Sequence, residues 1–220
     1  MAKTLGLVAE MISANTITKN DHTNWQKEEE EWYNKFSLVY SKNNQFPVKS
    51  GKGKKWKLRG TQIEIEQWIQ EQKTLTLQFD GAYKNNPGQA GAGGIIYDQN
   101  GQIITTYEWG LGNMTNNMAK AYSLLIGTCI LKNLQAKNPV IIGDSAIMIA
   151  AMESGGDFKN QALNRIKHRI GDNSKQLGII QFKHVMGNYN TKADSLANSV
   201  VTRPIGQVRE NNNTYDKSIP

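Results

Sequence analysis

The stretch Thr-Leu-Thr-Leu-Gln-Phe-Asp-Gly-Ala over residues 74–82 decides the fold. Polar and apolar side chains alternate from Thr74 to Phe79, which predicts a β-strand that ends at Asp80-Gly81. The turn residues Asn85 to Gly88 follow, then a second predicted strand over 92–97, a hairpin turn over 98–101 and a third strand over 102–110. Three strands joined by short turns predict an antiparallel meander.

Helices and two further strands alternate after the meander. The predicted elements are a long helix over 118–134, an all-apolar strand over 139–143, a helix over 145–154, a basic helix over 161–170, a strand over 177–185 and a helix over 192–200. The apolar strand is typical of a central strand covered on both faces. We therefore expect an α/β fold over 74–202, in which helices cover both faces of a mixed sheet.

The composition is that of a globular protein with a polyanionic partner. The chain has 220 residues, of which 38% are hydrophobic, and no stretch approaches the ~18 apolar residues of a membrane span. Lys and Arg number 26 against 19 Asp and Glu, and the net charge of +7 favours nucleic acid first and an anionic membrane surface second. The single Cys129 excludes an internal disulfide and no secretory or transit signal is visible, so we expect an intracellular, reducing compartment.

The two ends of the chain lack the clear alternation of strand and helix patterns that its middle shows. Residues 1–73 are predicted to form an irregular, partly helical extension, with helical patterns over 25–40 and 61–72, and residues 203–220 a flexible tail. Between the two helical patterns, residues 49–59 hold six cations, two glycines and one tryptophan. This basic strip is either a solvated linker or a phosphate-binding segment with a tryptophan for base stacking. Its candidate nucleic-acid-binding residues are Lys52, Lys54, Lys55, Trp56 and Lys57.

Three aspartates occupy positions at which α/β proteins form sites. Asp80 and Asp144 each follow a predicted strand, and Asp194 lies at the start of the last predicted helix. Ligand sites in open α/β sheets lie beyond the carboxyl ends of the strands. Each aspartate could equally serve a turn. Converging carboxylates, however, need cations to neutralise them, and Mg²⁺ or Mn²⁺ would be suited to oxygen ligands.

Several motifs resemble the RNase H family, in the version found in plant retroelements. They lie in the family's order within residues 74–202: Phe79-Asp80-Gly81-Ala82, Asn86-Pro87-Gly88, Gly91-Ala92-Gly93-Gly94, Thr115-Asn116-Asn117-Met118-Ala119, Gly143-Asp144-Ser145, His184-Val185, Asn190, Ala193-Asp194 and Leu196-Ala197-Asn198. The resemblance implies an RNase H-like five-stranded mixed sheet flanked by helices. It also implies metal-dependent endonucleolytic cleavage of the RNA strand of an RNA/DNA hybrid.

The resemblance also assigns roles to individual residues. Asp80, Asp144 and Asp194 match three of the four carboxylates with which the family holds two metal ions. His184 matches a mobile histidine that aids proton transfer or product release, and the alternative is a strand-end histidine without chemistry. Contacts to 2′-hydroxyls of the hybrid would come from four asparagines, each of which could equally be a turn or capping residue. They are Asn85, Asn86, Asn116 and Asn117.

The fourth carboxylate is the departure from the family pattern. Its position, after Thr115-Asn116-Asn117, holds Lys120, and no acidic residue lies between Glu108 and Asp144. Two divalent ions need the missing negative charge. We therefore expect the Lys120 ammonium to pair with Asp144 or Asp80 in place of one ion and to impair cleavage, unless Lys120 points to solvent. At most one divalent ion would then bind well, through Asp80 and Asp194.

Two functions remain open on the sequence alone. The first is a hybrid-directed endonuclease, active or weakened, which the retained aspartates and His184 favour. The second is a catalytically inactive RNase H-like component, structural or RNA-binding, of a ribonucleoprotein or retroelement-derived assembly, which Lys120 favours. Under either function we expect a nucleic-acid partner and no membrane. The two functions differ in whether the chain is an enzyme.

Overall fold

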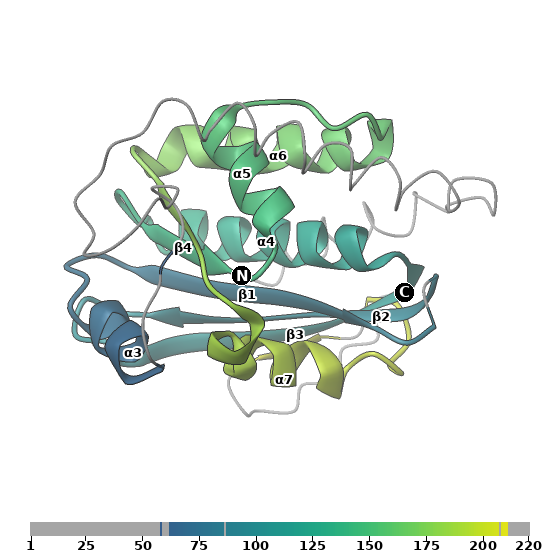
Figure 1. The fold of residues 1–220 in the computed structure, drawn as a ribbon, viewed down its shortest axis with the longest axis horizontal. Coiled ribbons are helices and arrows are strands. Elements are labelled where there is room, and N and C mark those ends of the chain that lie inside the picture. Colours follow the sequence, from purple (N-terminus) through teal and green to yellow (C-terminus); the bar gives the residue numbers. More distant parts are fainter. Residues whose placement is uncertain (1–57, 59–61, 86, 207, 211–220) are drawn as a thin grey trace.

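The computed structural model describes residue 58 and residues 62–85, 87–206 and 208–210 (Figure 1). The predicted helix over 25–40, Asn86 and all of the basic strip except Leu58 lie outside these residues. The elements are α3 (Gln62–Gln70), β1 (Thr76–Tyr83), β2 (Gly88–Tyr97), β3 (Ile103–Met114), α4 (Asn116–Asn133), β4 (Val140–Gly143), α5 (Ala146–Ser154), α6 (Gln161–Leu177), β5 (Gln181–His184), the 3₁₀-helix η2 (Gly187–Tyr189), α7 (Thr191–Ser199) and β6 (Val208–Glu210).

The strands form one mixed sheet in the order β5-β4-β1-β2-β3-β6. β1, β2, β3 and β6 pair antiparallel, which confirms the predicted meander, while β4 runs parallel to both β1 and β5. The five predicted strands are present, and β6 is a sixth that the sequence did not predict. It corrects the predicted flexible tail at residues 208–210, because Val208 pairs with Trp109 of β3. A strand of three residues is too short to show an alternating pattern.

Helices cover both faces of the sheet. In Figure 1, α4, α5 and α6 lie on one side of it, and α3 and α7 lie on the other. The strand β4 shows why both faces need cover: Ile141 belongs to the core beneath α4, whereas Val140 and Ile142 belong to a second core with Ile69 of α3. This double burial explains the apolar run of the strand. Among the described residues, no helix combines the length and the apolar character needed to cross a membrane.

The end of β1 differs from the prediction in a way that matters for the site. The strand does not end at Asp80-Gly81 but continues to Tyr83, because its antiparallel ladder with β2 goes on and Asp80 pairs with Gly93. On the other side of β1, the parallel ladder with β4 ends at the pair Phe79 and Gly143. Asp80 therefore lies within β1, at the first position beyond the end of β4.

The boundary between α6 and β5 also differs from the prediction. The helix extends to Leu177, which is buried in the main core, so β5 begins at Gln181 rather than at residue 177. At the other end of β5, the backbone N–H of Leu58 donates to the carbonyl oxygen of His184 over 2.8 Å. Leu58 also packs against the second core. The N-terminal extension thus reaches the edge strand at its carboxyl end.

Candidate active site

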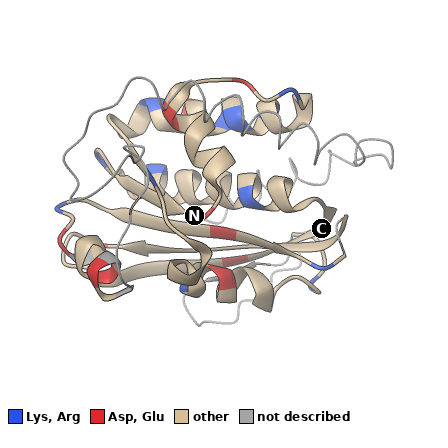
Figure 2. Cartoon of the chain, viewed as in Figure 1, with Lys and Arg blue, Asp and Glu red and all other residues tan. Residues whose placement is uncertain are grey.

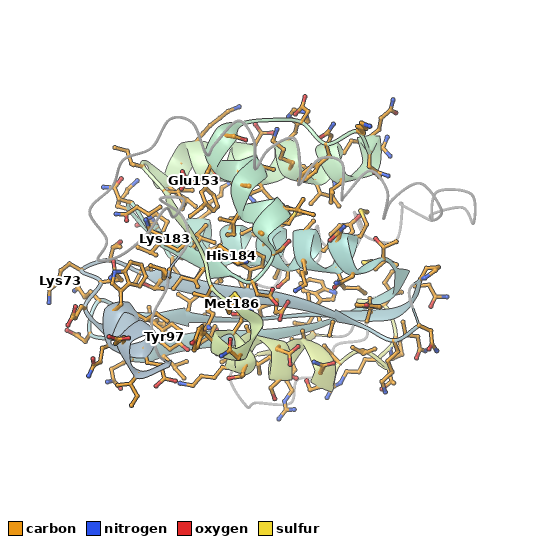
Figure 3. All side chains as sticks on the ribbon, in the orientation of Figure 1. Lys73, Tyr97, Glu153, Lys183, His184 and Met186 are labelled. Atoms are coloured by element: carbon orange, nitrogen blue, oxygen red, sulfur yellow. The ribbon has the colours of Figure 1, made fainter. Side chains whose placement is uncertain are left out.

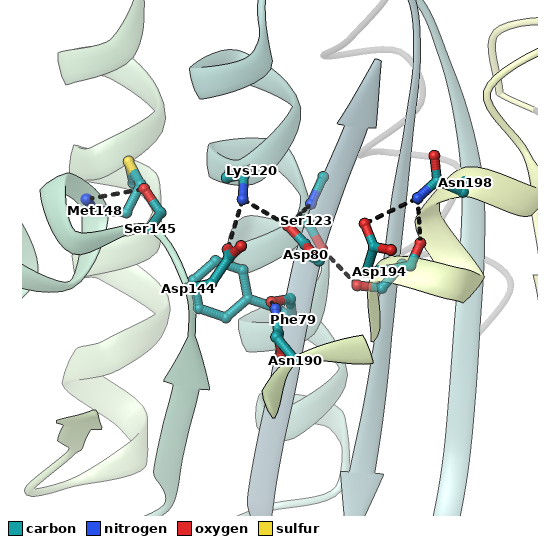
Figure 4. A network of polar contacts seen from close by, with 12 residues as sticks. Phe79, Asp80, Lys120, Ser123, Asp144, Ser145, Met148, Asn190, Asp194 and Asn198 are labelled. Atoms are coloured by element: carbon teal, nitrogen blue, oxygen red, sulfur yellow. Dashed lines mark hydrogen bonds and ion pairs between the residues drawn. The ribbon is translucent and has the colours of Figure 1, made fainter. Parts of the chain in front are cut away.

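Side chains from β1, α4 and the end of β4 meet where β1 runs beyond β4. Asp80 lies on β1, Asp144 directly follows β4, and Lys120 lies in the second turn of α4. The Lys120 Nζ atom is 2.9 Å from Asp80 Oδ1 and 2.5 Å from Asp144 Oδ1 (Figure 4). The prediction that this ammonium lies within hydrogen-bonding reach of Asp144 or Asp80 is confirmed, and it contacts both.

The position of α4 is fixed by a close approach to the sheet. A Cβ atom on Gly81 would lie only 2.3 Å from the carbonyl carbon of Ala119 and from the nitrogen of Lys120, so the two backbones meet where Gly81 leaves room. The Thr115 side chain caps the helix by accepting from the N–H of Met118. The packing of α4 on β1 therefore fixes the backbone position from which the Lys120 side chain extends.

The three charged groups are largely shielded from water. The exposed fractions of their side chains are 3% for Asp80, 13% for Lys120 and 19% for Asp144. Burial raises the pKa of Asp80 to about 6, although the charge of Lys120 opposes the rise. For Lys120, burial lowers the pKa, but the charges of Asp80 and Asp144 outweigh it and raise the pKa above its ordinary value. Lys120 therefore stays an ammonium throughout the neutral range.

The third predicted metal ligand lies on another element. Asp194 is exposed in the first turn of α7, where the Asn198 amide donates to its Oδ1 atom over 2.8 Å (Figure 4). Within the described part of the chain, no three His, Cys, Asp or Glu side chains are grouped so that they could hold a metal ion. The donor set does not fit a two-metal site, because an ammonium occupies the point at which the Asp80 and Asp144 carboxylates converge.

His184 is the last residue of β5 and is buried (Figure 3). Its Nε2 atom is 2.9 Å from the carbonyl oxygen of Asp144, and its own carbonyl oxygen accepts from Leu58. This placement favours the alternative of a strand-end histidine over that of a mobile one. A role of His184 in proton transfer stays a prediction.

Three of the four candidate asparagines come to one end of the sheet. Asn85 lies in the β1–β2 turn with a φ of 58°, and Asn116 and Asn117 begin α4. The pair between Gly88 and Met114 brings this turn beside the start of α4. The N-cap of α4 is Thr115, so neither Asn116 nor Asn117 caps it. Their contacts with nucleic acid stay predictions.

The site lies in a part of the chain that matches a known family. The profile of the family described as reverse transcriptase-like, a family of RNase H-like domains, matches residues 78–200, more than half of the chain. The chain belongs to the RNase H family. Membership confirms the resemblance drawn from the motifs, and the matched range contains Asp80, Lys120, Asp144 and Asp194.

Two RNase H relatives are similar in both sequence and structure. A bifunctional protein of Mycobacterium tuberculosis is 25% identical over 128 residues, which are 58% of this chain and 35% of that protein. Ribonuclease HI of Halobacterium salinarum is 26% identical over 123 residues, 56% of this chain and 62% of that protein. The chain therefore spans less than two thirds of the length of either relative.

Solved structures show the same RNase H fold. The N-terminal RNase H domain of the mycobacterial protein, solved as a fusion with maltose-binding protein, has a TM-score of 0.56 at 25% identity and covers 58% of this chain and 92% of that chain. RNase H1 of Halobacterium salinarum has the same TM-score and identity, and the match covers 59% of this chain and 98% of that chain. LC11-RNase H1 in complex with an RNA/DNA hybrid has a TM-score of 0.55, and the match covers 58% of this chain and 96% of that chain. Because the identity is only 23%, this structure shows the fold alone.

Two residues that support this RNase H site were not among the predicted site residues. Asn190 is fully buried and its amide donates to the carbonyl oxygen of Phe79, which ties the segment before α7 to β1 beside Asp80. Glu108 lies across the sheet from Gly93 and accepts from Ser199 of α7. Asn190 belongs to the motifs that resemble the family, whereas nothing in the sequence around Glu108 indicates its contact.

Proposed function

We propose that this RNase H-family domain binds RNA/DNA hybrid and that cleavage of the RNA strand, the family's activity, is impaired in it. The observation that carries the proposal is the position of Lys120 between Asp80 and Asp144. Metal-assisted phosphoryl chemistry depends on carboxylates that are free to hold cations beside the reacting phosphate. In this chain both carboxylates give an oxygen to the same ammonium.

The charge of the chain supports a nucleic-acid partner. The net charge is +7, and cations are present on the helical layer that covers the α4 side of the sheet (Figure 2). They include Arg165 and Arg169 of α6. The names of the relatives support hybrid as the partner: one is a ribonuclease HI, and the solved part of another is an RNase H domain.

A second candidate rests on the same ammonium. A chain that has lost the free carboxylates but kept the fold could act as a non-catalytic component that binds RNA, in a ribonucleoprotein or a retroelement-derived assembly. The two candidates share binding and differ in cleavage and in the preferred duplex. Both can therefore be decided with one set of labelled duplexes.

The experiment measures binding and cleavage on the same substrates. Fluorescence anisotropy with end-labelled RNA/DNA hybrid, double-stranded RNA and double-stranded DNA should give the tightest binding for the hybrid. In a cleavage assay with Mg²⁺ or Mn²⁺, the wild-type chain should cut the hybrid slowly. Lys120→Glu should cut it faster, because the variant provides an additional carboxylate beside Asp80 and Asp144.

Lys132→Glu is the matched control. It makes the same charge change on the same helix, twelve residues further on, which is about 18 Å along the axis. It should leave cleavage slow. A wild-type chain that cuts hybrid as fast as Lys120→Glu would refute the impairment, equal binding of all three duplexes would remove the preference for hybrid, and tightest binding to double-stranded RNA would favour the second candidate.

A further inference from the structure

Lys120, Asp80 and Asp144 form a self-contained charge cluster. One ammonium faces two carboxylates at 2.9 Å and 2.5 Å, and the Asp80 side chain among them is only 3% exposed. A buried carboxylate is costly unless a cation lies beside it. In a site built from carboxylates alone, a bound metal ion or a proton would lower that cost. Here an ammonium of the protein itself supplies the cation.

The ammonium is held in place from both ends. Its backbone lies against Gly81, where a Cβ atom would come within 2.3 Å of the Lys120 nitrogen, so α4 has no room to shift toward the sheet. One turn further along α4, Ser123 donates to the carbonyl oxygen of Gly93 over 2.9 Å and fixes the rotation of the helix. The side chain of Lys120 thus emerges from a fixed point and ends on two fixed oxygens.

A divalent ion would have to displace this ammonium before it could bind both carboxylates. Displacement would break both ion pairs and move a positive charge out of a shielded site, while the incoming ion would need about six oxygen ligands. Gly187 of η2 also lies near this point, since a Cβ atom on it would lie 3.5 Å from Asp144 Oδ2. That segment therefore passes close to the second oxygen of Asp144.

From this geometry we infer that Lys120 takes the place of a divalent cation between Asp80 and Asp144, so that neither the melting of the domain nor its binding to nucleic acid responds to divalent metal. The inference rests on the proposed function for its binding part. Its folding part stands on the cluster alone. The net charge of the cluster is that of one carboxylate, which leaves less repulsion toward a phosphate backbone than a cluster of free carboxylates would.

The experiment compares binding and melting with and without divalent ions at matched ionic strength, because salt weakens phosphate contacts by itself. For the wild-type chain, the Kd for labelled hybrid should be equal in EDTA and in Mg²⁺ to within about twofold, and the melting temperature should not rise with Mg²⁺. Lys120→Glu should bind at least about tenfold more weakly in EDTA than in Mg²⁺. Its melting temperature should rise with Mg²⁺, since the ion binds only the folded state.

Two further variants separate charge from fold. Lys120→Met keeps the length of the side chain but removes the ammonium, and it should melt lower than the wild type in EDTA. Lys132→Glu should behave like the wild type in both buffers. A wild-type chain that needs Mg²⁺ to bind hybrid, or that melts higher in its presence, would overturn the inference while the proposed function stands. Loss of hybrid binding in every buffer would overturn the proposed function, and the melting curves would still decide the folding part.

Discussion

At the scale of single residues, Asp80 has the most unusual environment among the site's side chains. It lies within a strand and is nearly inaccessible to water, yet it carries a carboxyl group beside both an ammonium and a second carboxylate. Burial favours its neutral form and Lys120 favours its charged form, and burial is the larger effect, so its pKa is raised to about 6. The site therefore takes up a proton more readily than the unfolded chain does.

This shift predicts a pH dependence of stability. Between the ordinary pKa near 3.8 and the folded value of about 6, the folded chain holds a proton on Asp80 that the unfolded chain has released. The contribution to stability is therefore complete below about pH 4 and is lost as the pH rises through about 6, with a total of about 3 kcal/mol. Urea unfolding from pH 4 to 7 should show this fall in the wild type relative to Asp80→Asn, and parallel curves for the two proteins would contradict it.

At the scale of elements, the packing of α4 on β1 sets the site. The 18-residue helix buries most of its length against the sheet, and its closest contact is at Gly81, next to Asp80. A second helix, α7, approaches the other face in the same way, since a Cβ atom on Gly93 would lie 2.2 Å from the Ala197 nitrogen. Glycines in adjacent strands thus let two helices lie close to the strands that carry the site.

Two glycine-to-alanine variants should therefore change stability in opposite directions. Gly81→Ala forces a methyl group onto the α4 backbone and should lower the free energy of unfolding by roughly 1–3 kcal/mol or more. Gly171→Ala lies in α6, where an added Cβ atom meets nothing within 4 Å, and should raise it by roughly 0.5–1 kcal/mol. Denaturant titration of both proteins measures the difference, and a harmless Gly81→Ala would show that α4 can move away from β1.

At the scale of the whole molecule, the extension is attached beside the site. The backbone N–H of Leu58 donates to the carbonyl oxygen of His184, and the His184 ring contacts the Asp144 carbonyl oxygen. Hydrogen bonds through His184 thus connect Leu58, the described residue of the basic strip, to the charge cluster. The cations that precede Leu58 in sequence lie outside the described residues. Their predicted role is to bind phosphates rather than to recognise a base sequence.

Replacing the four lysines of the strip, Lys52, Lys54, Lys55 and Lys57, by alanine should weaken binding to any duplex. On double-stranded DNA, the plot of log affinity against log salt concentration should become less steep, by up to ~0.9 in slope for each phosphate that the strip no longer neutralises. A control that replaces Lys73, Lys137, Lys159 and Lys175, all exposed, makes the same change in net charge at other places. Equal slopes for the strip variant and the wild type would mean that the strip is a linker.

The sequence by itself determined the order of the elements apart from β6, the family, and the three residues that meet in the charge cluster, which are Asp80, Lys120 and Asp144. Alternation and apolar runs report which side chains are buried, and the motif after Thr115 marked Lys120 as the departure from the family pattern. Burial patterns repeat over many residues, so they can be read without coordinates. The short β6 could not be, because three residues carry too little periodicity.

The tertiary structure decided what the site residues do to one another. Asp80 lies inside β1 rather than after it because β2 continues beyond β4. The Lys120 ammonium lies between two carboxylates, while Asp194 bonds to Asn198 on α7. Asp80 and Asp144 are far apart in the sequence, and they come together because β1, which holds Asp80, pairs with β4, which Asp144 directly follows. Their shared contact with Lys120 depends on strand pairing and helix position, which no local pattern in the sequence encodes.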